Sequence, residues 1–264
     1  MRVATWNVNS VTARLPRLNE WLELVEPDVV CLQETKTAAF PGDHAESLGY
    51  QVAHHGDGRW NGVAILSRVG LTDVSLGFPG QPGFAAEDEG ALLQVARVEP
   101  RAVGATCGGL RIWSLYVPNG RTVDDAHYGY KLEWLDRFRD AVDAEPRPLV
   151  VTGDFNIAPT DDDVWDIGAF EGSTHVTAPE RERLAALRDL GLTDVIPRPL
   201  KYDKPFTYYD YRAGMFHKNM GMRIDLVLAS AGIEVSDAYI DRDARKGTGP
   251  SDHCPVVVDL TLPG

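Results

Sequence analysis

Polar side chains that can bind a cation or move a proton recur where the apolar runs of this sequence stop. Inside a core such side chains would need hydrogen-bond partners, so their position at strand ends indicates a functional site. The groups are Asn7 and Asn9 after Val3-Ala4-Thr5-Trp6; Gln33-Glu34-Thr35-Lys36 after Val29-Val30-Cys31-Leu32; Tyr116 and Asn119 after Ile112-Trp113-Ser114-Leu115; Gly153-Asp154-Phe155-Asn156 after Leu149-Val150-Val151; Asp225 within Arg223-Ile224-Asp225-Leu226-Val227; and Ser251-Asp252-His253 before Val256-Val257-Val258.

The donor types in these groups indicate a metal site for phosphate chemistry. Carboxylate and amide oxygens predominate, with a single imidazole, and such donors suit a hard cation such as Mg²⁺ or Mn²⁺. Zinc would prefer more imidazole or thiolate. A histidine beside an aspartate suits a positioned proton donor or base. Because Mg²⁺ that keeps several waters is typically completed by substrate phosphate, the residues predict metal-assisted phosphoester hydrolysis.

Other catalytic motifs are absent from the sequence. It has no G-x-S-x-G elbow, Walker A loop, Rossmann fingerprint or H-E-x-x-H helix, which are the signatures of other enzyme classes. The run Asp161-Asp162-Asp163 resembles a calcium loop but lacks the glycine and distal glutamate of an EF-hand.

The elements that must position these residues are short strands and three amphipathic helices. Apolar runs predict strands over residues 2–8, 28–33, 50–54, 62–67, 92–98, 110–117, 149–152, 224–229 and 256–262, and periodic apolar faces predict helices over 14–25, 125–142 and 179–190. This mixture favours a mixed α/β sandwich. Because no linker or repeat interrupts the pattern, we expect one domain over residues 1–264.

Composition excludes several classes of protein. The 264 residues include 44% apolar and 25% charged residues, as in ordinary globular domains. No apolar run is long enough to span a membrane, and the first residues do not resemble a signal peptide. The three cysteines, Cys31, Cys107 and Cys254, are too few and too far apart for a disulfide framework, which suits a reducing cytoplasm.

At the strand ends the sequence resembles the exonuclease III family of abasic-site endonucleases, within the endonuclease/exonuclease/phosphatase superfamily. The resemblance extends over almost the whole chain, and the matching strings occur in the order typical of that family. They are Thr5-Trp6-Asn7-Val8-Asn9, Leu32-Gln33-Glu34-Thr35-Lys36, Tyr116-Val117-Pro118-Asn119-Gly120, Gly153-Asp154-Phe155-Asn156, Arg223-Ile224-Asp225 and Ser251-Asp252-His253-Cys254-Pro255.

This resemblance implies a fold and a metal. The fold would be a four-layer sandwich, in which two mixed β-sheets pack face to face with helices on the outside. The metal would be Mg²⁺ or Mn²⁺, with Glu34 as its principal ligand, Asn7 beside it, and Asp252 supporting the metal or its waters. Whether one or two ions act stays open.

The resemblance also implies a reaction, which is in-line attack of water on the DNA phosphodiester 5′ of an abasic sugar, leaving a 3′-hydroxyl. Asp154 would orient or deprotonate the water, and Asn156 would hold the water or the phosphate. His253, held by Asp225, would stabilise the developing charge. Asp154 is the preferred base, because an imidazole near several carboxylates is biased towards its cationic form, but His253 as the base is the alternative.

Substrate contacts are implied as well. Tyr116 and Asn119 would donate to phosphate oxygens. Tyr208, Met222 and Ile224 would line an apolar pocket for the abasic sugar. Arg212 lies in a segment that resembles the loop entering the DNA groove, and an inserted side chain can fill the place of a flipped nucleotide.

The partner implied is double-stranded DNA with abasic sites or blocked 3′ ends, bound by a monomer. The net charge of −13 would repel DNA if it were spread evenly. We therefore expect a local basic stripe on an acidic body, and we expect Lys36 to be a solvated charge. The stripe comprises Arg212, His217, Lys218, Arg223, Arg242, Arg245 and Lys246, and acidic residues concentrate elsewhere, as in Glu87-Asp88-Glu89.

Two other functions are compatible with the same fold. One is a phosphatase for lipid or inositol phosphates, and the other is a non-enzymatic nucleic-acid-binding regulator. The Arg212 loop and its aromatic neighbours favour DNA over a lipid. The presence of Glu34, Asp154 and His253 favours an enzyme over a regulator.

Overall fold

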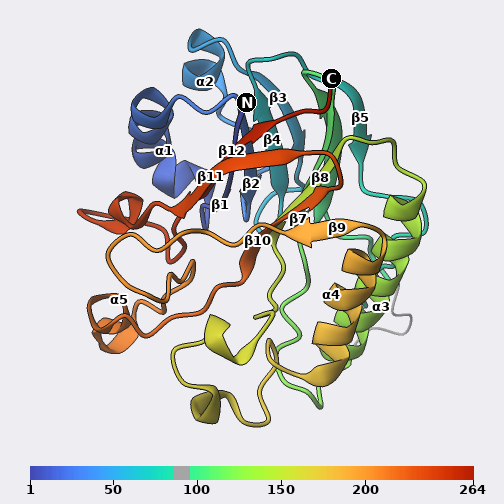
Figure 1. Ribbon diagram of the computed structural model, residues 1–264, viewed down its shortest axis with the longest axis vertical. Helices are drawn as coiled ribbons and strands as arrows, with labels where there is room; N and C mark the ends of the chain where they lie inside the picture. Colours follow the sequence, from blue (N-terminus) through green and yellow to red (C-terminus); the bar gives the residue numbers. More distant parts are fainter. Residues whose placement is uncertain (86–95) are drawn as a thin grey trace.

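Two six-stranded mixed sheets form the middle of the molecule (Figure 1). The computed structural model describes residues 1–85 and 96–264. The first sheet has the order β11 (Glu234–Ile240), β12 (Val256–Thr261), β1 (Arg2–Asn7), β2 (Val29–Gln33), β4 (Val63–Ser67) and β3 (Gln51–His55). The second sheet has the order β5 (Thr72–Leu76), β6 (Ala102–Cys107), β7 (Leu110–Tyr116), β8 (Leu149–Asp154), β10 (Asp225–Ser230) and β9 (Leu192–Asp194).

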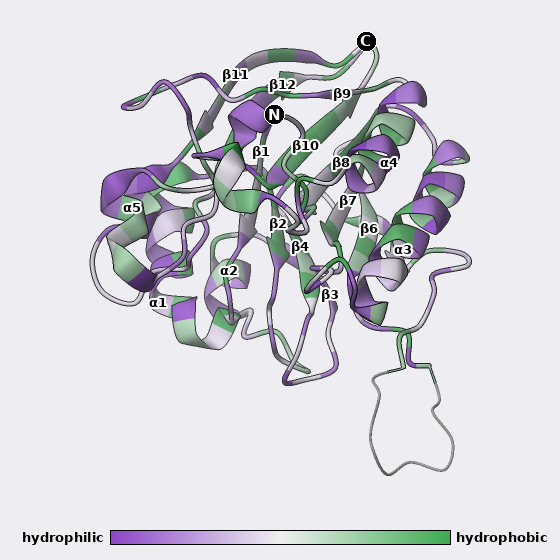
Figure 2. Ribbon diagram, turned by 90° about the horizontal axis from the view of Figure 1, so that it is seen from below, coloured by the Kyte–Doolittle hydropathy of each residue, from purple (hydrophilic) through white to green (hydrophobic). Residues whose placement is uncertain are grey.

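Helices cover the outer faces of both sheets (Figure 2). The helices α1 (Val11–Val25) and α2 (Asp43–Ser47) lie on the first sheet, and α3 (Ala126–Asp143) and α4 (Ala178–Asp189) lie on the second. The short helix α5 (Met215–Lys218) and 3-10 turns at Asp161–Asp163, Ile167–Phe170, Arg212–Gly214 and Arg242–Arg245 occur in the connections. The predicted four-layer sandwich is thus confirmed. Among the described residues, no helix has the length and apolarity needed to cross a bilayer.

The apolar core has three layers, because the central strands of each sheet are buried on both faces. In β2, Val29 and Cys31 contact the layer between the sheets, while Val30 and Leu32 contact the layer under α1 and α2. This double burial explains why the strands appear in the sequence as continuous apolar runs instead of alternating ones.

The strand directions bring the polar ends of the strands to one edge of the sandwich. β1 and β2 are parallel, and so are β7 and β8, so each pair presents its carboxyl ends together. β12 is antiparallel to β1, and β10 is antiparallel to β8, so both begin at the edge where their partners end. All six predicted groups of polar residues occupy these positions.

Apart from the strand over 92–98, the predicted elements are present with small shifts, and four strands were missed. Helix α1 begins at Val11, three residues before the predicted start, where the Ser10 hydroxyl accepts a hydrogen bond from the Ala13 backbone N–H at 3.4 Å. The missed strands are β5, β6, β9 and β11. Much of the predicted strand over 92–98 lies outside the described residues.

The missed strands lack a strong apolar pattern for physical reasons. β5 and β11 lie at sheet edges, where most side chains of β5 and the first three of β11 are exposed, and β9 has three residues. β6 carries Gly104, where an added Cβ would lie 2.7 Å from the ring of Trp113. Its weak sequence signal therefore follows from close packing against the neighbouring strand.

Candidate active site

A cavity of about 210 Å³ opens at the edge where the polar strand ends meet. The predicted site residues all line it, except Asn7, Asp225 and Arg212. Larger hollows occur elsewhere among the described residues, two of them of about 810 and 530 Å³, and none contains a predicted catalytic or metal-binding residue. The lining of the smaller cavity consists of Glu34, Tyr116, Asn119, Asp154, Asn156, His175, Tyr208, Met222, Ile224, Asp252 and His253.

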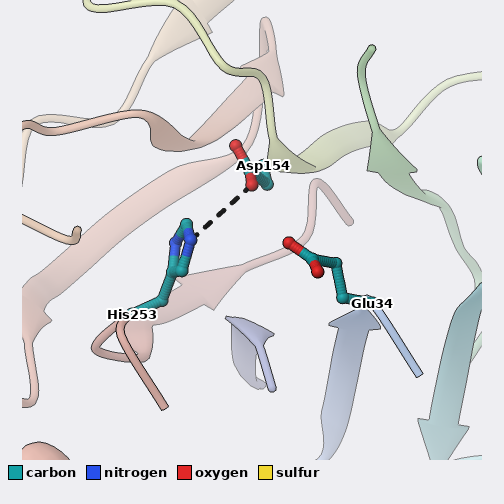
Figure 3. Close-up of side chains that lie close together, drawn as sticks. All are labelled: Glu34, Asp154 and His253. Carbon is teal, nitrogen blue, oxygen red and sulfur yellow. Dashed lines mark ion pairs between the residues drawn. The ribbon is translucent and has the colours of Figure 1, made fainter. Parts of the chain in front are cut away.

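Three side chains capable of binding a metal converge in this cavity (Figure 3). One ligand atom from each of Glu34, Asp154 and His253 lies within 4.8 Å of those from the other two. They come from the segment after β2, the end of β8 and the segment before β12, which are far apart in the sequence. The Nε2 atom of His253 is 3.8 Å from Oδ2 of Asp154.

Asn7 holds the two carboxylates together from behind the cavity. Its Nδ2 donates to Oε1 of Glu34 at 2.8 Å and to Oδ2 of Asp154 at 2.9 Å. Its Oδ1 accepts from the backbone N–H of Asn9 at 3.0 Å. The amide nitrogen of Asn7, rather than its oxygen, therefore faces the acidic cluster.

Lys36 lies against the same cluster, so the expectation of a solvated charge was wrong. Its Nζ donates to Oε2 of Glu34 at 2.7 Å and to Oδ1 of Asn9 at 2.6 Å. Burial raises the pKa of Glu34, but the charge and hydrogen bond of Lys36 outweigh it, so the pKa is lowered overall. Asn9 in turn donates to Asp252 at 3.1 Å.

The chemistry of this donor set fits a bound divalent cation. A positive charge, the Lys36 ammonium, already lies where oxygens of Glu34 and Asn9 converge. Carboxylate and amide oxygens are typical ligands of hard cations in proteins. The acidic cluster could therefore hold a metal ion.

The His253 imidazole is held as a cation by two buried aspartates. Its Nδ1 is 2.7 Å from Oδ2 of Asp225, and both side chains are almost fully buried. Burial lowers the pKa of His253, but the charge and hydrogen bond of Asp225, together with the charge of Asp154, raise it to about 10. At neutral pH both ring nitrogens therefore carry protons, and Nε2 can donate into the cavity.

The pKa of the Asp154 carboxyl group lies near neutral pH. Burial and the charge of Asp225 raise the pKa of Asp154, while His253 and the hydrogen bond from Asn7 lower it, and the result is about 7. Its Oδ1 accepts from the backbone N–H of Asn156 at 2.9 Å. A carboxylate with a pKa near 7 is well suited to accept a proton.

Gly153 sets the direction in which β8 leaves the sheet before Asp154. Its φ is +141°, and an added Cβ would lie 2.0 Å from the carbonyl oxygen of Leu115 on β7. Only glycine fits at this position. The glycine in the Gly-Asp-Phe-Asn string is therefore required by the packing of two neighbouring strands.

Two amides and a phenol add hydrogen-bond donors to the cavity. Asn119 Nδ2 donates to Oδ1 of Asn156 at 3.2 Å, and Asn156 Nδ2 donates to the carbonyl of Val117 at 3.0 Å. Burial raises the pKa of the Tyr116 hydroxyl well above its ordinary value. Tyr116 therefore stays protonated and can donate.

Another wall of the cavity is apolar. Tyr208 and Met222 exchange backbone hydrogen bonds of 2.9 and 3.0 Å, and the ring of Tyr208 lies 5.0 Å from that of His253. Met222 and Ile224 are buried in one apolar cluster with Val164. The three residues predicted to form an apolar pocket are therefore brought together beside the acidic cluster.

His175 lines the cavity and was missed by the sequence reasoning. Its Nδ1 is 2.6 Å from the carbonyl oxygen of Asn156. Burial and the charge of Lys131 lower the pKa of His175 to about 4, so the ring is neutral at pH 7. No apolar run precedes His175, and strand ends were the signal used, so this residue had no sequence signature.

The expected basic stripe is interrupted. Arg223 is 3% exposed and pairs with Asp163 and Asp194, so the expectation that it faces DNA was wrong. Arg245 is also buried. Arg212 lies outside the cavity on an exposed turn, where it pairs with Asp210, and Glu87-Asp88-Glu89 lies outside the described residues.

Comparisons with known proteins agree with this geometry. Residues 4–253 match the endonuclease/exonuclease/phosphatase family. The chain is 31% identical to exodeoxyribonuclease III of Haemophilus influenzae, with 97% of this chain and 98% of that protein covered.

Two solved structures share the fold over nearly the whole chain. The 3′ phosphatase NExo from Neisseria, bound to a product DNA hairpin, has a TM-score of 0.89 and 33% identity, covering 99% of this chain and 100% of that one. An AP endonuclease from Archaeoglobus fulgidus has a TM-score of 0.88 and 31% identity, with the same coverage. From its sequence, its two-sheet architecture and the site between the sheets, the chain belongs to the endonuclease/exonuclease/phosphatase family.

Proposed function

We propose that this protein is a metal-dependent DNA-repair nuclease. It hydrolyses the phosphodiester 5′ of abasic sites to leave a 3′-hydroxyl, and it removes nucleotides and phosphates from 3′ ends of duplex DNA. The observation that carries this proposal is the convergence of Glu34, Asp154 and His253 in a cavity whose other wall is apolar. The names of the similar proteins, an exodeoxyribonuclease, a 3′ phosphatase and an AP endonuclease, support the same substrates.

The metal in this proposal is Mg²⁺ or Mn²⁺. Glu34 is its principal ligand, Asp252 supports the metal or its waters, and Asn7 fixes the Glu34 carboxylate. When bound, the ion neutralises phosphate charge and stabilises the leaving 3′-oxygen. Lys36 donates to the same carboxylate, so the ammonium and the ion would share the acceptor sites of its two oxygens.

In the proposed reaction, Asp154 accepts a proton from the attacking water. The oxygen of that water forms the new bond to phosphorus as the bond to the 3′-oxygen breaks, and the departing oxygen takes a proton from solvent to become the 3′-hydroxyl. His253 donates from Nε2 to a phosphate oxygen, and Asp225 keeps the imidazole charged and oriented. These groups supply positioning and positive charge to an anionic transition state.

The other predicted residues bind substrate in this proposal. Tyr116, Asn119 and Asn156 donate to phosphate oxygens or hold the attacking water. The apolar wall of Tyr208, Met222 and Ile224 receives the abasic sugar. The exposed Arg212 approaches the DNA beside the cavity, and duplex DNA is the partner.

The protonation states favour Asp154 over His253 as the base. With its pKa raised to about 10, His253 has no free nitrogen at neutral pH, whereas Asp154 with a pKa of about 7 is partly ionised. We therefore assign the base to Asp154 and the electrophilic role to His253.

We also propose that residues 1–264 act as one catalytic domain, because both sheets contribute residues to one cavity. We propose that the protein acts as a monomer, because a single chain supplies all the residues of that cavity. The three cysteines are buried and free, which supports a reducing compartment such as the cytoplasm.

The test uses three labelled duplexes with Mg²⁺, which contain an internal abasic analogue, a 3′-phosphate at a nick, and an unmodified recessed 3′ end. We expect incision to a 3′-hydroxyl, phosphate release and nucleotide removal, all abolished by a chelator. Asp154→Asn should lose activity on each duplex. Asp140→Asn, at a half-exposed surface carboxylate, is the control and should keep it. If the wild-type protein binds these duplexes but hydrolyses none with Mg²⁺ or Mn²⁺, the proposal is wrong.

A further inference from the structure

We propose that the buried ion pair of Lys131 and Glu180 positions one side of the cavity, formed by Asn119, Asn156 and His175 and called here the polar wall. Both residues lie on helices outside the sheets, Lys131 on α3 and Glu180 on α4, and neither lines the cavity. The inference deepens the proposed function and rests on it, because it assigns a positioning role for the same reaction.

Lys131 connects directly to two cavity residues through their backbone. The side chains of Lys131 and Glu180 are both 0% exposed, and Nζ of Lys131 pairs with Oε1 of Glu180. The same Nζ donates to the carbonyl oxygen of Asn156 at 2.7 Å and to that of Asn119 at 3.2 Å. Lys131 thus joins the loop after β7 to the loop after β8.

Glu180 connects the ion pair to a third loop, which carries Thr174 and His175. Its Oε1 accepts from the Thr174 hydroxyl at 2.6 Å and from the backbone N–H of His175 at 2.9 Å. Its Oε2 accepts from the Thr177 hydroxyl at 2.7 Å, which caps the first turn of α4. Because His175 lines the cavity, the ion pair reaches all three loops that form this wall.

The contacts show why the pair has a role beyond packing. A buried ion pair adds little to stability compared with apolar side chains of similar volume, so stability alone does not explain its presence. Here the ammonium directs its remaining hydrogen bonds to the carbonyls of two cavity residues, whose side-chain amides contact each other at 3.2 Å. A shift of either carbonyl therefore moves an amide donor in the cavity.

The chain offers a matched control at the other end of β7. Arg111 pairs with Glu145, and the two side chains are 6% and 16% exposed. Arg111 also donates to the Asp73 carbonyl and the Ser75 hydroxyl, and none of these residues lines the cavity. Breaking this pair removes a buried charge without touching the cavity.

The experiment compares Lys131→Met with Arg111→Met on the 3′-phosphate duplex, well below the unfolding temperature of each variant. Since a misplacement of about 1 Å can cost about 100-fold in rate, we expect Lys131→Met to lower kcat by roughly 30-fold to 100-fold with KM within about threefold. Arg111→Met should keep kcat within about twofold. If Lys131→Met does not fold, Thr174→Val, which removes one link to Glu180, should lower kcat in the same direction.

Two further readouts separate positioning from a merely structural role. In a double-mutant cycle, Lys131→Met and Asn119→Ala should be less than additive in kcat, because one acts through the other. The side-chain amide resonances of Asn119 and Asn156 should shift in Lys131→Met but not in Arg111→Met. This NMR readout holds even if the wild type hydrolyses no DNA, which would refute only the proposed function. A folded Lys131→Met, or Thr174→Val in its place, with unchanged kcat and unchanged amide resonances would overturn the inference.

Discussion

Replacing Asp225 by asparagine tests the electrostatic design of the site, because it removes one charge and keeps the shape. Asp225 lies 2.7 Å from Nδ1 of His253 and contributes to the raised pKa values of both His253 and Asp154. In the variant, burial still lowers the pKa of His253, but the charge of Asp225 no longer raises it. Both pKa values should therefore fall.

The size of the effect follows from the structure. The pKa of His253 is about 10, compared with an ordinary value of 6.5, and this difference corresponds to a preference on the order of 5 kcal/mol for the charged imidazole. At pH 8.5 a histidine with a pKa of 10 is about 97% protonated, whereas one with a pKa near 6.5 is about 1% protonated. Loss of the imidazolium should thus lower activity by up to about 100-fold at pH 8.5, and by less at pH 6.5.

Two assays follow this change. NMR titration of the metal-free protein should give a pKa for His253 near 10 in the wild type and below about 8 in Asp225→Asn. In the wild type, activity should rise as Asp154 ionises near pH 7 and fall as His253 loses its proton near pH 10. Both the rise and the fall of this pH–activity profile should move to lower pH in the variant. If His253 titrates near 6.5 in the wild type, or near 10 in both proteins, the electrostatic account is wrong.

Three further predictions concern the metal, the cavity and the DNA. Glu34→Gln should raise the Mg²⁺ concentration for half-maximal activity by about tenfold or more, since it removes a ligand charge, and an unchanged metal titration would exclude Glu34 as a ligand. His175→Gly, compatible with the φ of +81° at that position, should widen the cavity and raise abasic incision relative to 3′-phosphate removal. An unchanged ratio would show that His175 does not limit the space for the sugar. Arg212→Ala should weaken duplex binding, because the Arg212 side chain is 87% exposed and can reach a phosphate. The slope of the logarithm of the dissociation constant against the logarithm of salt concentration should fall by about 1. An unchanged slope would exclude a phosphate contact.

The fold was predictable where burial leaves a strong pattern. β2 and β8 are buried on both faces, so their apolar runs marked them in the sequence. The exposed β5 carries no such run. Its place in the sheet depends on hydrogen bonds to β6, and hydrogen bonds between distant segments leave no local pattern.

The site residues that stand at strand ends were also predictable from the sequence. Asp154 and His253 stand at strand ends, which the topology brings to one edge. His175 and Lys131 lie in a loop and on a helix, so their approach to the cavity depends on packing that no local pattern encodes. For Arg223 the sequence reasoning predicted a site role that the structure does not support. Its partners Asp163 and Asp194 are distant in the sequence, so Arg223 appeared to be an unpaired basic residue near the site.

The central claim is that side chains from distant strand ends bind one divalent cation beside the base and the imidazolium. Anomalous diffraction from crystals containing Mn²⁺ would locate that ion. We predict a peak at roughly 2.0–2.3 Å from a carboxylate oxygen of Glu34, in the cavity with Asp154 and His253. A manganese peak found only elsewhere on the protein, with none bound to Glu34, would contradict the account.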